Sequence, residues 1–258
     1  MKRWGDFVET GFQIINAIKS NNTCEQICEL NESGILEKII PEVKSMKEVG
    51  QCKYHKVDCF SHTIYALEEF EKLLVEDNFP NHLKKEIWKY LKSEVEENLQ
   101  VLDLLKLGVF LHDIGKANAK TIDENGRVHF KGHEKFSGDI AIKVGENLKL
   151  SSKSQKLLYN FTRYHMYLLN LYKKSNASRD VLKEMFGELQ DDIIGVMLLG
   201  FADIIATKRL IEPKEDEEIL NIVKKNMNVR DKVHLLIEQA NEHGGHDNIA
   251  AVLIEGGR

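Results

Sequence analysis

The most constraining stretch of the sequence is an apolar run that ends in a histidine and an aspartate. Residues 104–111 are apolar apart from one lysine, and His112 and Asp113 follow directly, with Gly115 and Lys116 behind them. A helix this apolar is expected to be buried over most of its circumference. An imidazole and a carboxylate at its end are costly to desolvate unless a partner compensates them. Such a pair is suited to a divalent metal site.

A second apolar stretch, residues 193–206, is interrupted only by Asp203. A buried carboxylate there must be protonated, paired with a basic group or bound to a metal. A lone buried aspartate bonded to backbone or to a lysine would be unremarkable. Two such sites in one chain, together with well-spaced histidines, favour the metal.

Composition describes an ordinary globular protein. The chain has 258 residues, of which 42% are hydrophobic and 30% charged, and its formal net charge is −5. That charge argues against broad nucleic-acid wrapping but allows a local phosphate pocket. The N-terminus does not resemble a signal peptide, and no apolar run is long enough to span a bilayer, so we expect a cytoplasmic protein without membrane contact. Cysteines 24, 28, 52 and 59 are then expected to be free thiols.

Hydrophobic spacing predicts an all-α fold. The expected helices include Asp58 to about Val75, a long charged helix from about residue 81 to 100, and one from about Ser152 to Leu169. An Asn-Gly pair between short alternating arms predicts a small β-hairpin over residues 120–130. We expect an N-terminal helical segment at residues 1–55, a core domain at 56–210 and a short α/β tail at 211–258.

The candidate ligands lie on separate predicted helices or helix ends. They are His62, His112, Asp113, His133, His165 and Asp203. Any one histidine could instead be an ordinary core or surface residue. The joint pattern is what predicts that the side chains meet inside a helical bundle.

This pattern resembles the HD superfamily of metal-dependent phosphohydrolases. Residues 34–42, 54–63 and 126–134 further resemble the HD part of bacterial tRNA nucleotidyltransferases of the CCA-adding and poly(A) polymerase type. The resemblance covers about residues 30–207. No nucleotidyltransferase head with its carboxylate pair precedes it, so nucleotide addition is not expected.

The resemblance implies a metal centre of one or two divalent ions (Fe, Mn, Co, Ni, Zn or Mg). The first metal would be held by His62, His112, Asp113 and Asp203. Asp113 would bridge to a second metal held by His133 and His165. Paired cations bind a phosphoryl group and activate water as hydroxide.

Lys116 and Asp113 are the predicted catalytic residues. Lys116 is the candidate for neutralising a substrate phosphate, and a solvent-facing lysine is the alternative. Arg163 and His129 are further candidate substrate contacts, although a surface salt bridge suits Arg163 and a surface position suits His129 and His55.

The tail resembles the end of PPM-type protein phosphatases. There the aspartate of Gly-Gly-x-Asp-Asn binds metal, but Asp247 alone cannot make that site. Residues 249–254 predict a strand, which could pair two chains into a homodimer.

The predicted function is hydrolysis of a nucleotide, cyclic phosphate or short phosphodiester by metal-activated hydroxide. One alternative is a non-catalytic module that binds RNA or nucleotides. Another is an HD-type di-iron oxygenase.

Overall fold

The computed structural model describes residues 4–50, 57–174, 178–211, 222, 225 and 227–242. The chain divides into two compact units, residues 1–210 and residues 211–258. Across the described residues, every helix is too short or too polar to traverse a lipid bilayer. The predicted C-terminal strand at 249–254 and Asp247 lie outside the described residues.

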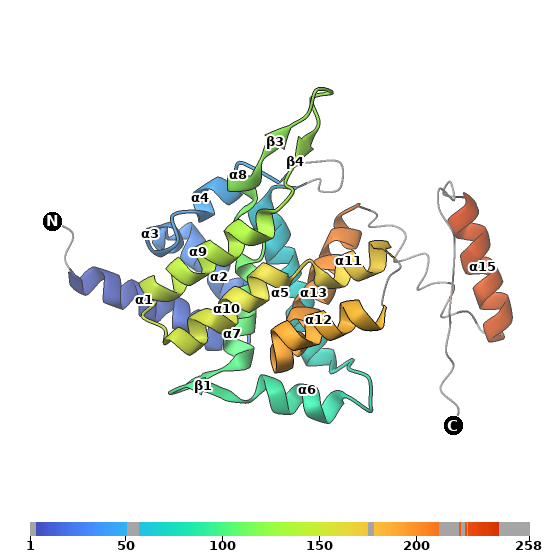
Figure 1. Cartoon of the computed structure of the whole chain (residues 1–258), viewed down its shortest axis with the longest axis horizontal. Helices are drawn as coiled ribbons and strands as arrows, with labels where there is room; N and C mark the ends of the chain where they lie inside the picture. Colours follow the sequence, from blue (N-terminus) through green and yellow to red (C-terminus); the bar gives the residue numbers. More distant parts are fainter. Residues whose placement is uncertain are drawn as a thin grey trace. The chain divides into compact units, whose positions relative to one another are not determined.

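The first unit is a bundle of helices joined mostly by short turns (Figure 1). Its helices are α1 (Trp4–Lys19), α2 (Thr23–Glu32), α3 (Ile35–Ile39), α4 (Val43–Met46), α5 (Cys59–Glu76), α6 (Lys84–Leu91), α7 (Val101–Leu111), α8 (Lys116–Ala119), α9 (His133–Asn147), α10 (Ser152–Tyr164), α11 (Tyr167–Lys174), α12 (Arg179–Leu189) and α13 (Ile193–Ile211). A 3-10 turn, η1 (Gln190–Asp192), leads into α13. In the second unit, α15 spans Val229–Glu242. The predicted all-α class is confirmed.

Two small antiparallel hairpins complete the first unit. Strands β1 (Glu94–Glu96) and β2 (Leu99–Gln100) form one, and β3 (Thr121–Ile122) and β4 (Val128–His129) form the other. The second is the hairpin that the Asn-Gly pair predicts. Gly126 takes the left-handed conformation that its turn requires, with φ of 74°.

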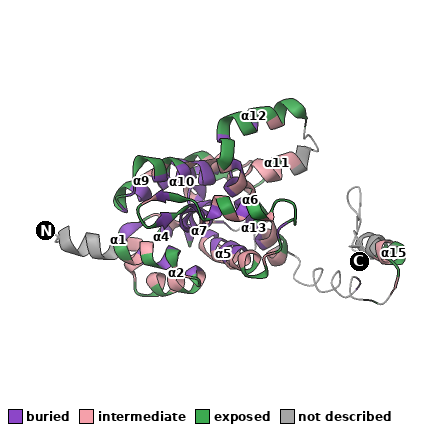
Figure 2. Cartoon of the chain, turned by 90° about the horizontal axis from the view of Figure 1, so that it is seen from below, coloured by how far each residue is buried: buried purple, intermediate pink, exposed green. Residues whose placement is uncertain are grey.

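The central helix of the first unit is α7, which is buried along most of its length (Figure 2). It packs against α1, α5, α9 and α10, as its apolar sequence predicts. Its one lysine, Lys106, is also buried and donates to the carbonyls of Ser20 (2.6 Å) and Ile18 (3.3 Å). Lys106 thereby satisfies carbonyl groups that the end of α1 leaves without helical partners.

Side-chain caps fix the start of two helices that position the site. Asp58 caps α5 by accepting from the Ser61 amide at 2.9 Å, and Ser151 caps α10 by accepting from the Ser154 amide at 3.2 Å. His62 lies four residues after the Asp58 cap, whereas His165 lies at the opposite end of α10 from the Ser151 cap.

The predicted long helix from residue 81 to 100 is wrong. The helix ends at Leu91, and the chain then forms the β1–β2 hairpin, with Asn98 at φ 60°. Glu96 in this hairpin accepts from the Ser151 amide (2.8 Å) and the Ser154 hydroxyl (2.7 Å) at the start of α10. This long-range contact outweighs the local helix propensity.

The predicted helix from Ser152 to Leu169 is interrupted. The first segment, α10, ends at Tyr164, and α11 begins at Tyr167. His165 therefore caps the C-terminal end of α10.

Candidate metal centre

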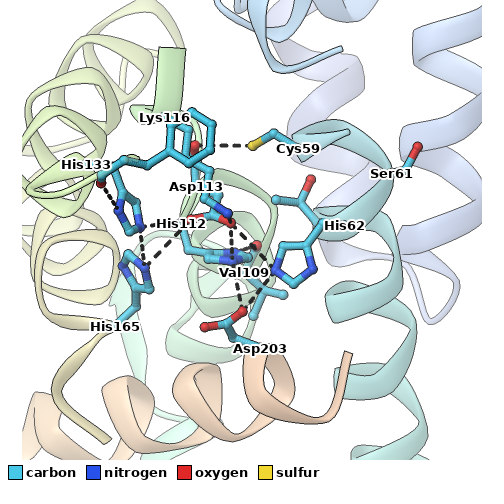
Figure 3. Close-up of polar contacts among 12 residues, drawn as sticks. Cys59, Ser61, His62, Val109, His112, Asp113, Lys116, His133, His165 and Asp203 are labelled. Carbon is cyan, nitrogen blue, oxygen red and sulfur yellow. Dashed lines mark hydrogen bonds and ion pairs between the residues drawn. The ribbon is translucent and has the colours of Figure 1, made fainter. Parts of the chain in front are cut away.

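Six side chains from five parts of the first unit meet inside the bundle (Figure 3). All six are buried: His62 on α5, His112 and Asp113 after α7, His133 at the start of α9, His165 at the end of α10 and Asp203 on α13. The structure therefore brings together every ligand that the sequence predicts.

The first group consists of His62, His112 and one carboxylate oxygen each from Asp113 and Asp203. His62 Nε2 lies 2.9 Å from Asp203 Oδ1 and 3.6 Å from Asp113 Oδ2. His112 Nε2 lies 3.4 Å from Asp113 Oδ2 and 3.5 Å from Asp203 Oδ1. Two imidazole nitrogens and two carboxylate oxygens thus face a common centre.

The second group gathers around the other oxygen of Asp113. His133 Nε2 lies 2.9 Å and His165 Nε2 lies 3.9 Å from Asp113 Oδ1. The two Nε2 atoms are 3.1 Å apart. Asp113 therefore presents one oxygen to each group, which is the arrangement of a bridging carboxylate.

Three of the histidines are oriented by the same contact. The Nδ1 atoms of His112, His133 and His165 lie 2.7, 2.9 and 2.7 Å from the carbonyl three residues earlier, at Val109, Phe130 and Thr162. A carbonyl can only accept, so each Nδ1 carries the proton. When the ring is neutral, its Nε2 then offers a lone pair to the centre.

This donor set fits a cation. With Nδ1 protonated on both rings, the Nε2 atoms of His133 and His165 would direct lone pairs at each other across 3.1 Å unless a cation or proton lies between them. His112 Nε2 is buried and makes no hydrogen bond with the described residues, although both carboxylates are near. Imidazole and carboxylate ligands suit Zn²⁺, Fe²⁺, Mn²⁺, Co²⁺ or Ni²⁺.

Charges within the cluster shift its pKa values strongly. Burial alone would raise the pKa of Asp113, but Lys116 and then His112 outweigh it and hold that pKa well below its usual range. Burial alone would lower the pKa of His112, but Asp113 and Asp203 raise it to about 10. Without a metal, His112 is therefore protonated at neutral pH.

His165 shows the opposite shift. Burial, followed by repulsion from His112 and His133, lowers its pKa to about 3. His165 therefore stays neutral and keeps its Nε2 lone pair available at neutral pH.

Lys116 lies inside the centre rather than on the surface. Its side chain is 4% exposed, and its Nζ is 2.5 Å from Asp113 Oδ2 and 5.9 Å from the centre of the Phe130 ring. Burial alone would lower its pKa, but Asp113 outweighs burial and raises it. The solvent-facing alternative is therefore wrong, and contact with a substrate phosphate stays a prediction.

The other two predicted substrate contacts lie in different settings. Arg163 is partly exposed, with its Nη1 3.9 Å from Glu134 Oε1, and Glu134 Oε2 is 3.9 Å from His133 Nδ1. His129 is half-exposed on the β3–β4 hairpin, where its Nε2 lies 2.8 Å from Asp123 Oδ2. Substrate binding by either residue stays a prediction, and His55 lies outside the described residues.

Two residues that the sequence analysis missed touch the backbone of residues 112–116. The thiol of Cys59 lies 3.3 Å from the Asp113 carbonyl, and the hydroxyl of Ser137 accepts from the Gly115 amide at 3.0 Å. Their spacing was the available signal. Cys59 precedes His62 by three residues and Ser137 follows His133 by four, which places each on the ligand's face of its helix.

Comparison with known proteins agrees with this geometry. The family model for the HD domain matches residues 82–250, well over half of the chain. The chain belongs to the HD domain family, as its sequence resemblance predicted. The match leaves out His62, which the structure nevertheless places in the first group.

A relative of known type is the A-adding tRNA nucleotidyltransferase of Deinococcus radiodurans. It is 24% identical over 215 residues, which are 78% of this chain and 43% of that protein. The chain therefore aligns with less than half of its relative, and the predicted similarity to this kind of protein is confirmed. The predicted phosphatase-like tail stays a prediction, since the HD match itself extends to residue 250.

Proposed function

We propose that this protein is a metal-dependent phosphohydrolase acting on a small phosphorylated substrate, such as a nucleotide, a cyclic phosphate or a short phosphodiester. The observation that carries the proposal is the division of the Asp113 carboxylate between two groups of imidazoles. Phosphohydrolase activity is typical of the HD family.

In this proposal, the chain's own residues hold and orient the centre. His62, His112 and Asp203 hold the first cation, and His133 and His165 hold the second, with Asp113 shared. When bound, such cations supply the Lewis acidity that activates water and neutralises phosphoryl oxygens. The carbonyls that bind Nδ1 keep the rings aimed at the centre, so little reorganisation is needed when substrate arrives.

Lys116 has a second role in the proposal. Its buried ammonium is fixed beside Asp113 and adds positive charge where phosphoryl oxygens would lie. Because Lys116 is held by an ion pair rather than extended into water, its charge is already placed before substrate binds.

A screen that combines metals and substrates tests the proposal. Protein loaded separately with Mn²⁺, Fe²⁺, Co²⁺, Ni²⁺ or Zn²⁺ should hydrolyse p-nitrophenyl phosphate esters, mononucleotides or 2′,3′-cyclic nucleotides with at least one metal. Asp113→Asn should abolish turnover, while His129→Ala should retain metal. Metal-loaded protein that turns over none of these substrates would contradict the proposal.

A non-catalytic RNA- or nucleotide-binding module is a second candidate. The observation that favours it is the similarity to part of a tRNA nucleotidyltransferase. Saturable binding of tRNA or of a nucleotide by metal-loaded protein, without any product, would support this candidate over the hydrolase.

A further inference from the structure

The turn that carries the central ligands is anchored from both sides. It consists of residues 112–116, between the end of α7 and the start of α8. Within it, the Asp113 carbonyl accepts from the Lys116 amide at 3.0 Å. Its outside contacts come from Cys59 on α5 and Ser137 on α9, and Figure 3 shows the Cys59 contact.

Cys59 and Ser137 each lie on the same helix as one of the candidate metal ligands. On α5, Cys59 holds the Asp113 carbonyl, and His62 lies three residues later. On α9, His133 lies at the first position, and Ser137, four residues later, holds the Gly115 amide. Because residues three or four apart lie on one helix face, each helix contacts both the turn and the centre with the same face.

The contact with α9 leaves almost no freedom of position. A Cβ atom added to Gly115 would lie 2.4 Å from the Ser137 amide nitrogen and 2.5 Å from the His133 carbonyl oxygen. The backbone of the turn therefore lies directly against the backbone of α9. The Ser137 hydroxyl is fully buried, so it provides the partner that the Gly115 amide would otherwise lack.

From this arrangement, and resting on the proposed metal centre, we propose that Ser137 and Cys59 are positioning residues. They fix where the two carboxylate oxygens of Asp113 lie relative to His133 and His62. Ser137 sets Oδ1 against His133, and Cys59 sets Oδ2 against His62. Oδ1 lies 2.9 Å from His133 Nε2, and Oδ2 lies 3.6 Å from His62 Nε2. Neither residue touches the reacting atoms.

The two anchors act on different metals. Loss of the Ser137 hydroxyl removes the hydrogen bond between the turn and α9, so the group of His133 and His165 should weaken first. Loss of the Cys59 thiol releases the turn from α5, so the group of His62 should weaken first. Residues that orient metal ligands typically change metal affinity by about 10- to 100-fold when they are replaced.

Titration of the metal-stripped full chain with Co²⁺, followed by visible absorption and elemental analysis, tests this inference. Ser137→Ala should weaken binding of one of two equivalents by roughly 10- to 100-fold. Ser154→Ala is the matched control, because Ser154 is also fully buried but bonds to Glu96. Ser154→Ala should lower the melting temperature about as much as Ser137→Ala does, but it should leave both cobalt affinities unchanged.

The thiol is tested by a pair of variants. Cys59→Ala should weaken the other equivalent, whereas Cys59→Ser keeps a donor and should retain it. If Ser137→Ala does not fold, the comparison of Cys59→Ala with Cys59→Ser still tests the positioning role. Wild-type cobalt affinities in both Ser137→Ala and Cys59→Ala, or equal weakening in Ser154→Ala, would overturn the positioning role.

The outcomes separate this inference from the proposed activity. A wild-type protein that binds two cobalt ions but hydrolyses no phosphate ester would contradict the hydrolase and leave the positioning role standing. A wild-type protein that takes up no cobalt would overturn both.

Discussion

The ion pair between Lys116 and Asp113 gives the most direct test of how the centre is stabilised. Asp113→Asn keeps the shape of the side chain and removes its charge. Lys116 is then left with its ammonium 4% exposed and without the carboxylate that lay 2.5 Å away. His112 loses one of its two carboxylate neighbours as well.

The expected cost follows from this burial. Breaking a buried ion pair from one side typically destabilises a protein by about 3–5 kcal/mol, because the remaining charge is uncompensated. For a unit of this size, each kcal/mol lowers the melting temperature by about 2–4 °C, so a fall of roughly 6–20 °C is expected for Asp113→Asn.

A double-mutant cycle isolates the pair. Lys116→Met alone should also destabilise, since it leaves Asp113 with one cation fewer, but Asp113→Asn/Lys116→Met should lose less than the two single changes added together. Chemical denaturation in the presence of a chelator measures each free energy of unfolding without metal. Asp192→Asn is the control for loss of a carboxylate charge, because Asp192 is only partly buried, accepts from Asn160 at 2.7 Å and lies outside the centre.

Additive effects would refute this reasoning. If the double variant lost the full sum, the two charges would not be coupled. The same conclusion would follow if Asp113→Asn cost no more than Asp192→Asn.

Four further predictions concern metal uptake, the stability of the metal-free protein and the support of α1. The pKa of His112 is raised to about 10, so binding of the first metal should release one proton, and its affinity should rise about tenfold per pH unit between 7 and 10. Calorimetry in buffers of different ionisation enthalpy measures this proton release. Because the folded protein holds this proton more tightly than the unfolded chain, the metal-free protein should lose stability as pH rises from about 6.5 towards 10. His133→Ala should remove one metal equivalent by elemental analysis, and unchanged stoichiometry would indicate a mononuclear site. Lys106→Met should lower the free energy of unfolding by about 1–3 kcal/mol, because the carbonyls at the end of α1 lose their donor; a denaturation midpoint equal to that of wild type would exclude this capping role.

Sequence reasoning succeeded where the signal is local or chemically expensive. The apolar helix that ends in His112 and Asp113 could not be explained without buried partners, and the structure supplies them. The Asn-Gly hairpin is equally local, because its turn needs Gly126 in a left-handed conformation.

The remaining features depend on contacts between distant residues. Helix propensity around residues 92–100 could not reveal that Glu96 satisfies the start of α10. The burial of Lys116 was equally hidden, because it depends on where α8 lies against Phe130 and Asp113. Cys59 and Ser137 bind backbone groups of another segment. Hydrophobic periodicity does not reveal such bonds, and only the helical spacing of these residues from His62 and His133 indicated that they face the centre.

The buried carboxylates of the centre need positive charges nearby even when no metal is bound. Asp113 and Asp203 are buried, yet the pKa of each is held well below its usual range, so both are ionised. In the metal-free protein, Lys116 and the proton on His112 balance these charges from inside the cluster. A cation entering the first group must displace the His112 proton. His165 in the second group is already neutral, so it has no proton to give up when a cation binds. Between these two histidines, the pH dependence of metal uptake above pH 7 should therefore come from His112 and not from His165.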